Sequence, residues 1–217
     1  MNESSRSALA SQVTTLNEQS ALRVGTNREF ASQVIAVDFK NLRSLFPKTT
    51  LSIHTFEQGT ENALLQGHID VGFDCDRPYS PDIAYKLIVD EPILAVATKE
   101  FIKTHKKQIA AGQYLDLPHL LCERLHPDKI LSRSENQLLV EARFNDIATT
   151  RAVCTQGLGW ALLPAYAIKK ELNAGTLVQI DQKAYGKSKY GVWWLRSRPH
   201  LKDVSENLIR WLHKQEL

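Results

Sequence analysis

The sequence predicts an α/β protein built from two lobes. Residues 22–73 alternate strand and helix patterns in the order β-α-β-α-β, with short connections, as in a parallel sheet that carries helices on both faces. A second block of alternating elements follows between residues 119 and 180. No stretch rich in Pro, Gly or Ser separates the blocks, so we expect two lobes joined by strands and not by a flexible tether.

The first block contains three strands and two helices. Apolar and β-branched residues alternate in the strands, whereas apolar positions recur at helical spacing in the helices. Pro47 ends the first helix because it cannot donate a backbone hydrogen bond, and Gly67 closes the second. The expected elements are a strand at 22–26, a helix at 31–45, a strand at 50–56, a helix that opens at Gly59-Thr60, and a strand at 69–73.

The rest of the chain continues the alternation. Two apolar runs, 83–89 and 93–98, predict two strands around a sharp bend at Asp90-Glu91-Pro92. Either Asn145 or Asp146 can cap the helix that follows it. The remaining strands are expected at 119–122, 140–144, 160–163, 176–180 and 190–195, and the helices in parts of 99–112 and at 129–139, 147–156, 164–174 and 201–217.

The composition excludes several classes of protein. The 27 basic and 24 acidic residues give a net charge of +3, far below that of a dedicated nucleic-acid binder. Three scattered cysteines make no disulfide framework, and the histidines lack the spacing of metal ligands, so we expect no metal and no other cofactor. The first 20 residues lack the apolar core of a signal peptide, and no window is apolar enough for a membrane helix, so we expect a cytoplasmic protein without membrane contact.

No catalytic motif is present in the sequence. The GxSxG, P-loop, GxGxxG and HExxH signatures are absent, and no carboxylates are convincingly paired. We therefore assign no catalytic residue and expect that the chain is not an enzyme. The alternative that stays open is a cytoplasmic small-molecule-binding protein, or an enzyme, on the same two-lobed fold.

Four segments together resemble the effector-binding domain of LysR-type transcriptional regulators. They are the opening strand and helix at 22–47, the run Thr60-Glu61-Asn62-Ala63-Leu64-Leu65-Gln66-Gly67-His68-Ile69-Asp70-Val71-Gly72-Phe73, the run Asp90-Glu91-Pro92-Ile93-Leu94-Ala95-Val96-Ala97, and the run Thr155-Gln156-Gly157-Leu158-Gly159-Trp160-Ala161-Leu162-Leu163-Pro164. The resemblance covers residues 22–217. It implies two Rossmann-like lobes, as in type 2 periplasmic binding proteins, with a small-molecule effector in the cleft between them.

The resemblance also implies a domain plan. Lobe one is expected to comprise 22–97 plus 182–217, and lobe two 98–181, with the chain crossing near 97–99 and 180–183. Residues 1–21, with an apolar stripe at Leu9, Val13 and Leu16, resemble the end of the family's linker helix or a tail.

The family's winged helix-turn-helix, which contacts DNA, is missing from the sequence. We favour a fragment over a natural stand-alone homologue, with DNA reached only through the absent domain. The resemblance further implies a homodimer, and possibly a tetramer in the full-length protein. In such a dimer the 31–45 helix of one chain would pack on a lobe-two helix of the other.

The candidate site follows from a general rule for open α/β sheets. Ligands bind beyond the carboxyl ends of the strands, where helix N-termini present unpaired N–H groups. The polar and strand-end residues at these places are our candidates for effector binding: Thr26, Asn27, Arg28, Glu29, Gln58, Gly59, Thr60, Phe73, Cys122, Glu123, Arg124, Asn145 and Asp146. The resemblance singles out Thr60 and the turn at 26–28, although Thr60 can equally be a plain helix cap.

The charge of the effector stays open at this point. Arg28 can pair bidentately with an anionic effector. The adjacent Glu29 would repel an anion and would suit an amine or a sugar.

Overall fold

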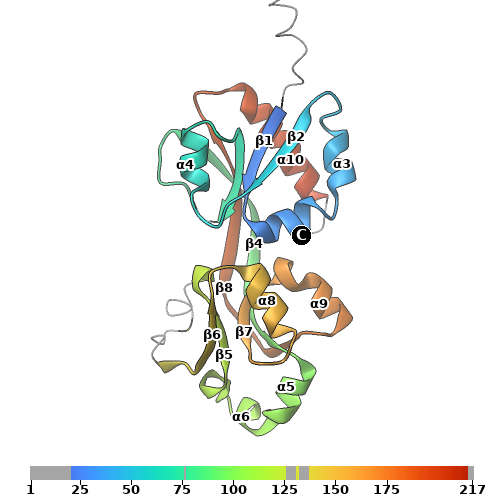
Figure 1. Ribbon diagram of the computed structural model, residues 1–217, viewed down its shortest axis with the longest axis vertical. Coiled ribbons are helices and arrows are strands. Elements are labelled where there is room, and N and C mark those ends of the chain that lie inside the picture. The colour runs from blue at the N-terminus through green and yellow to red at the C-terminus, as the bar shows by residue number, and fades with distance from the viewer. Residues whose placement is uncertain (1–20, 76, 126–130, 132–136, 215–217) are drawn as a thin grey trace, which may run out of the picture.

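The computed structural model describes residues 21–75, 77–125, 131 and 137–214. Two lobes lie one above the other, and two long strands run through both of them (Figure 1). The apolar stripe at Leu9, Val13 and Leu16 and most of the helix expected at 129–139 lie outside the described residues. None of the described helices is long and apolar enough to cross a membrane.

The upper lobe, which corresponds to the expected lobe one, contains a mixed sheet between helices; the lower lobe corresponds to lobe two. Strands β1 (Ala21–Thr26), β2 (Thr50–Thr55) and β3 (Val71–Cys75) pair in parallel, and β8 (Val178–Leu195) and β4 (Ile83–Ala97) continue the sheet antiparallel. Helix α4 (Thr60–Leu65) covers one face, while α3 (Phe39–Ser44) and α10 (His200–His213) lie on the other side (Figure 1). Trp193 packs with the α4 cluster and Trp194 packs against the α10 cluster, as the alternation of side chains along a strand requires.

The lower lobe repeats the pattern with shorter strands. Strands β5 (His119–Cys122) and β6 (Val140–Phe144) pair in parallel, and a bridge from His119 to Trp160 connects them to β7 (Ala161–Pro164). Trp160 is fully buried there. The helical segments of this lobe are α5 (Lys99–Thr104), α6 (Lys106–Ala110), α8 (Ile147–Cys154) and α9 (Lys169–Ala174), with 3₁₀ turns at Tyr114–Asp116, Glu123–Leu125 and Ala165–Ile168.

The two lobes share two continuous strands where the sequence analysis expected four separate ones. β4 passes Pro92 without ending, because three register shifts between Leu87 and Val96 bend the strand while its pairing with β8 continues. β8 joins the segments expected at 176–180 and 190–195. In β8, Gly186 has φ 110°, a conformation that a side chain would strain.

The strand pairing also moves both expected crossings. Residues 93–96 of β4 already pair with β7, and Ile93, Ala95 and Tyr185 belong to the core of the lower lobe. The crossing expected near 97–99 therefore lies before Ile93, and the one expected near 180–183 lies after Tyr185. Both predicted crossings thus lie inside the lower lobe. The apolar pattern of a strand predicts that a strand forms, but it does not reveal which sheet the strand joins.

The helix expected over 31–45 is broken and begins earlier. Asn27 accepts a hydrogen bond from the Phe30 amide at 2.8 Å and caps α2 (Arg28–Phe30). A π-helical turn, Ala31–Ile35, follows, and the helix resumes only at α3. The Asn27 cap therefore sets the start of this helix. The spacing of the apolar residues, which predicted a start at residue 31, does not.

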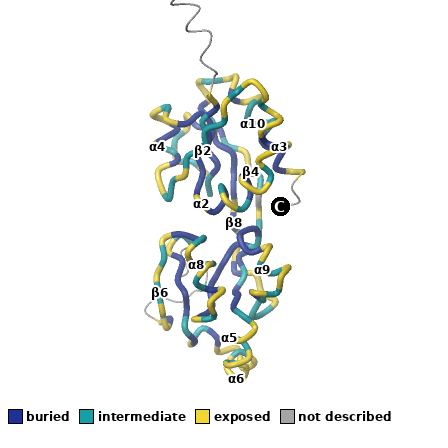
Figure 2. Tube along the Cα trace, turned by 45° about the vertical axis from the view of Figure 1, so that its right-hand side comes forward, coloured by how far each residue is buried: buried dark blue, intermediate teal, exposed yellow. Residues whose placement is uncertain are grey.

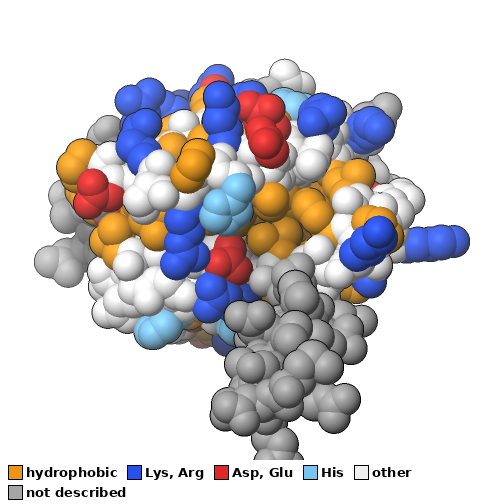
Figure 3. Space-filling view, turned by 90° about the horizontal axis from the view of Figure 1, so that it is seen from above, with side chains coloured by type: hydrophobic (Ala, Val, Ile, Leu, Met, Phe, Trp, Pro, Cys, Tyr) orange, Lys and Arg blue, Asp and Glu red, His pale blue; other side chains and the backbone are white. Residues whose placement is uncertain are grey.

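Most residues of β1, β3, β5 and β7 are buried, whereas most residues of α3, α5 and α6 are exposed (Figure 2). Seen from above, the end of the upper lobe carries cationic, anionic and apolar side chains next to one another (Figure 3). This mixed surface agrees with the small net charge of the chain.

Candidate functional site

The strand ends of the two lobes meet at a small cavity. It is lined by Asn27, Glu29, Glu57, Arg124, Asp146 and Ile147. The first three follow the carboxyl ends of β1 and β2 in the upper lobe, and the others follow β5 and β6 in the lower lobe. Because this is the edge at which open α/β sheets bind ligands, the cavity is the candidate site. Its volume of about 10 Å³ is that of a single water molecule, so the lobes are closed on each other.

Arg124 connects the lobes across this cavity. Its Nη1 donates to the main-chain carbonyl of Glu57, and its Nη2 lies 3.4 Å from Asp74 Oδ1. The 3₁₀ turn after β5 presents this side chain, whereas both of its partners belong to the upper lobe. The guanidinium therefore connects the strand ends of one sheet to those of the other.

A second arginine reaches the upper lobe from α8. Arg151 Nη1 donates to Glu171 Oε1 at 2.8 Å, and its Nε lies 3.6 Å from Glu29 Oε1. The second distance is too long for a hydrogen bond, so Arg151 attracts Glu29 by charge alone.

Glu29 is a buried carboxyl group, with 2% of its surface exposed. Neither of its side-chain oxygens has a hydrogen-bond partner among the described residues. Burial raises the pKa of Glu29 from its ordinary value of 4.5 to about 7, Arg151 opposes that rise, and Glu171 and Asp146 add to it. A group of this kind, buried, titratable and without a donor, is typical of a binding site.

Aromatic rings fill the space beside the cavity. Phe30 stacks on Tyr190 at 4.4 Å and on Phe73 at 5.3 Å, and Tyr166 of the lower lobe meets Phe30 edge-on. Tyr190 also shares a hydrogen bond of 3.1 Å with Thr26 Oγ1. The contact between the lobes is thus an apolar stack on one side and charged groups on the other.

The family model for the LysR substrate binding domain matches residues 17–216. The chain belongs to the LysR substrate-binding domain family. The predicted family and the two-lobed α/β fold class are therefore confirmed.

Two curated relatives are similar to parts of the domain. The Hca operon transcriptional activator HcaR of Escherichia coli is 25% identical over 135 residues, which are 59% of this chain and 44% of HcaR. The HTH-type transcriptional regulator CitR of Bacillus subtilis is 23% identical over 171 residues, which are 75% of this chain and 58% of CitR. The chain spans about half the length of these relatives.

Solved structures show the same fold. The regulatory domain of CrgA from Neisseria meningitidis has a TM-score of 0.70 and 14% identity, with 89% of this chain and 99% of that chain covered. The effector-binding domain of AmpR from Citrobacter freundii has a TM-score of 0.72 and 18% identity, with 90% of this chain and 100% of that chain covered. At these identities the likeness shows the fold of the LysR domain alone.

The structure brings four of the predicted site residues of this LysR domain to the cavity. They are Asn27, Glu29, Arg124 and Asp146. Asp146 also caps α8, since its Oδ1 accepts a hydrogen bond of 2.7 Å from the Thr149 amide. The Nδ2 atom of Asn27 has no hydrogen-bond partner among the described residues.

The other predicted residues lie around the cavity and do not line it. Thr26, Phe73 and Cys122 are buried in the packing beside it. Gln58, Gly59, Glu123 and Asn145 are exposed. Arg28 points outward and lies 3.5 Å from Glu57 Oε1.

Thr60 is neither a helix cap nor a lining residue. Gly59, with φ 94°, occupies the cap position, and Thr60 is the first residue of α4. The Thr60 side chain lies over Gly72 of β3, where any larger residue would collide with it. Its buried hydroxyl has no hydrogen-bond partner in the described part of the chain.

Five residues that line the cavity or connect the lobes were not among the predicted effector-binding residues. Glu57 and Ile147 line the cavity, Asp74 pairs with Arg124, Arg151 faces Glu29, and Tyr166 packs across the lobes. Arg151 lies one helical turn after Ile147, so the i, i+4 spacing of a helix face was the available signal. Tyr166 follows the carboxyl end of β7, a position that the strand-end rule covers, but its partner Phe30 is 136 residues away in the sequence.

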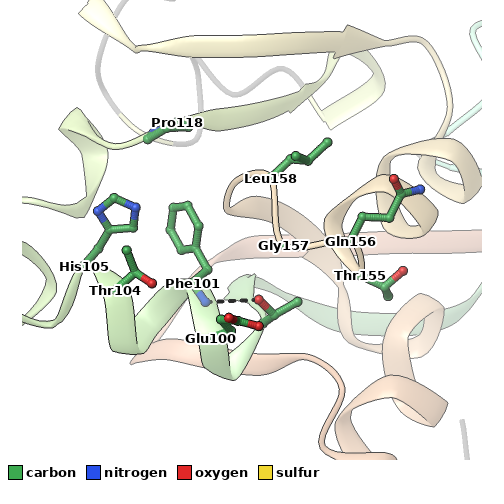
Figure 4. Close-up of a pocket in the computed structure, with 10 residues that line it drawn as sticks. Glu100, Phe101, Thr104, His105, Pro118, Thr155, Gln156, Gly157 and Leu158 are labelled. Atoms are coloured by element: carbon green, nitrogen blue, oxygen red, sulfur yellow. Dashed lines mark hydrogen bonds between the residues drawn. The ribbon is translucent and has the colours of Figure 1, made fainter.

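A second, larger hollow lies on the lower lobe, with a volume of about 450 Å³. Figure 4 shows it between α5 and the loop after α8, with Phe101, His105 and Leu158 around it. The dashed line there is the cap of α5, in which Thr98 Oγ1 accepts from the Phe101 amide at 3.2 Å. None of the predicted site residues lines this hollow.

Proposed function

We propose that this domain binds a small-molecule effector between its two lobes and that it is a sensor rather than an enzyme. The observation that carries the proposal is the convergence of residues from four strand ends on one cavity, where Asn27 and Glu29 keep polar atoms without a partner in the described part of the chain. Buried polar atoms without partners cost free energy, and a ligand that supplies those partners recovers it.

The closed cavity has a consequence for the mechanism. A site with room for one water molecule admits an effector only when the lobes separate, and separation breaks the contacts of Arg124 and Arg151. An effector that binds one inter-lobe arrangement better than another shifts the population toward it. Such a change rotates one lobe relative to the other. The rotation takes place in the bent segments of β4 and β8 that connect the lobes.

In the full-length protein, we propose, this motion controls a DNA-binding domain. The named relatives are a transcriptional activator and an HTH-type transcriptional regulator, and each is about twice as long as the matched segment. The signal passes through a homodimer in which α3 of one chain packs on the lower lobe of the other. Val37, Phe39 and Leu45, on and beside α3, support this contact because they expose 58%, 39% and 42% of their surface.

A thermal-shift screen of a metabolite panel tests the effector proposal. A ligand at about 100 times its dissociation constant stabilises the native state by about 2.7 kcal/mol, roughly 5–10 °C for a domain of this size. Arg124→Met is expected to weaken the binding of a hit. Arg210→Met, at an exposed position of α10 that does not line the cavity, is the matched control and is expected to leave the binding unchanged. Hits whose binding no inter-lobe substitution affects would contradict this site.

A further inference from the structure

The charged groups around the cavity do not balance one another. Of the described charged side chains that line it, three are carboxylates, Glu29, Glu57 and Asp146, and one is a guanidinium, Arg124. The lining therefore holds more acidic than basic side chains. A ligand that complements it carries a positively charged group.

Each of the three arginines near the cavity lies against an acidic side chain. Arg124 bonds to the Glu57 carbonyl and pairs with Asp74, and Arg28 lies against the Glu57 carboxylate. Arg151 donates from Nη1 to Glu171, whereas its Nε, which faces Glu29, has no hydrogen-bond partner among the described residues. An anionic ligand would have to displace protein carboxylates from these guanidinium groups.

Glu29 is in the opposite situation. It is 2% exposed, and both of its oxygens lack a hydrogen-bond donor within the described ranges. Arg151 stands 3.6 Å away and offers charge without a hydrogen bond. The unmet requirement of the cavity is thus a charged donor that can reach Glu29.

Asn27 adds a second requirement. Its Oδ1 accepts the capping hydrogen bond from Phe30, while its Nδ2 finds no acceptor among the residues that the structure describes. Asn27 and Glu29 are two residues apart on the same turn and line the same cavity. A ligand that satisfies both carries a donor cation and, beside it, an oxygen acceptor.

We propose that the effector is a small molecule with a primary amino group, protonated in solution, that donates to the Glu29 carboxylate while a neighbouring oxygen of the ligand accepts from Asn27 Nδ2. This inference rests on the proposed function and deepens it, because it assigns a chemical class to the effector. α-Amino acids and amino alcohols belong to this class.

Matched pairs of compounds test the proposal by isothermal titration. The probes are L-alanine with L-lactate, L-leucine with its 2-hydroxy acid, L-phenylalanine with L-phenyllactate, and 2-aminoethanol with ethylene glycol, so that each pair exchanges an amino group for a hydroxyl. We expect at least one amine to bind and its hydroxyl counterpart to bind about tenfold or more weakly. No binding by any amine, or equal binding of both members of a pair, would overturn the amine assignment.

Two variants locate the amino group. Glu29→Gln keeps the shape of the side chain and is expected to weaken the amine about tenfold or more. Glu141→Gln is the control, because Glu141 is an exposed residue of β6 that does not line the cavity; it is expected to keep the affinity within about threefold. Amine affinity that is unchanged in Glu29→Gln would overturn the proposal.

The same experiment separates this inference from the proposed function. A hydroxy acid or other compound without an amino group that binds, and that loses affinity in Arg124→Met, leaves the inter-lobe site standing and removes the amine assignment. A compound whose affinity is unchanged in both Arg124→Met and Glu29→Gln contradicts the inter-lobe site itself.

Discussion

Arg124 of the lower lobe donates a hydrogen bond to the main-chain carbonyl of Glu57 in the upper lobe. The same guanidinium lies 3.4 Å from Asp74, the residue that follows Phe73 in β3. One side chain thus joins two strand ends of one lobe to a strand end of the other. We expect this residue to determine how far the lobes stand apart.

Arg124→Met is expected to open the domain. The change removes both inter-lobe contacts and leaves Asp74 without this cation, at a cost of about 1–3 kcal/mol in the free energy of unfolding. Small-angle X-ray scattering measures the opening as a larger radius of gyration than in the wild type, and urea denaturation measures the stability. A radius of gyration equal to that of the wild type would show that the aromatic stack and the Arg151–Glu29 contact hold the lobes together without Arg124.

Glu29 is expected to make the domain less stable as the pH rises. Its pKa is about 7 in the folded state and 4.5 ordinarily, so the folded state binds more protons between these values and loses up to about 3 kcal/mol as the pH rises from 4.5 to 7. The groups that face Glu29 are Arg151 on α8, Glu171 and Lys170 on α9, and Asp146 before α8. Arg151 and Lys170 reduce the loss, and the two acids increase it.

The difference between the wild type and Glu29→Gln isolates this contribution. The variant cannot titrate at this position, so it is expected to gain stability relative to the wild type as the pH rises from 5 to 8. Urea midpoints of both proteins at each pH provide the measurement. Parallel pH curves would mean that Glu29 titrates as an ordinary carboxyl group.

His119 is expected to have the opposite pH dependence. It is 1% exposed, stacks on Trp160 at 4.1 Å, and burial lowers its pKa from 6.5 to about 4. The unfolded state therefore binds the extra proton between these values, and stability falls by up to about 3 kcal/mol as the pH drops from 6.5 to 4. His119→Phe keeps the stack, so its stability is expected to depend less on pH in this range; equal slopes for both proteins would contradict the assignment.

The proposed dimer makes a prediction about α3. Phe39→Glu places a charge on an exposed apolar surface, so it costs the monomer little but weakens an interface that covers this surface. Analytical ultracentrifugation over a concentration series compares the variant with the wild type. A wild type that stays monomeric at high micromolar concentration would contradict the dimer for this domain.

The sequence predicted the elements better than their connections. The strand ends followed from local patterns of apolar and polar residues, and the positions of Asn27, Glu29, Arg124 and Asp146 followed from the strand ends. The break in the first helix and the continuation of β4 past Pro92 depend on tertiary pairing, which a local pattern does not contain. The crossing points were displaced for the same reason.

The sequence predicted where in the fold the site lies, but it did not predict which side chains contact one another there. Arg151 lies inside α8, so it is not one of the strand-end positions that the rule selects. Tyr166 does follow the end of β7, but it was not among the candidates because only polar turns after other strands were selected. Thr60 was selected on the resemblance, yet its side chain lies over Gly72 and does not reach the cavity lining. Side-chain direction, which the sequence does not give, separates these cases.

Effector binding between the lobes can be observed residue by residue in a titration followed by ¹⁵N-edited NMR. The probe is the compound of the matched panel that binds most tightly. We expect the largest amide shifts at Asn27, Glu29, Arg124, Asp146 and Ile147, which line the cavity from both lobes. Saturable binding with shifts confined to the lower-lobe hollow around Phe101 and Leu158 would contradict the account.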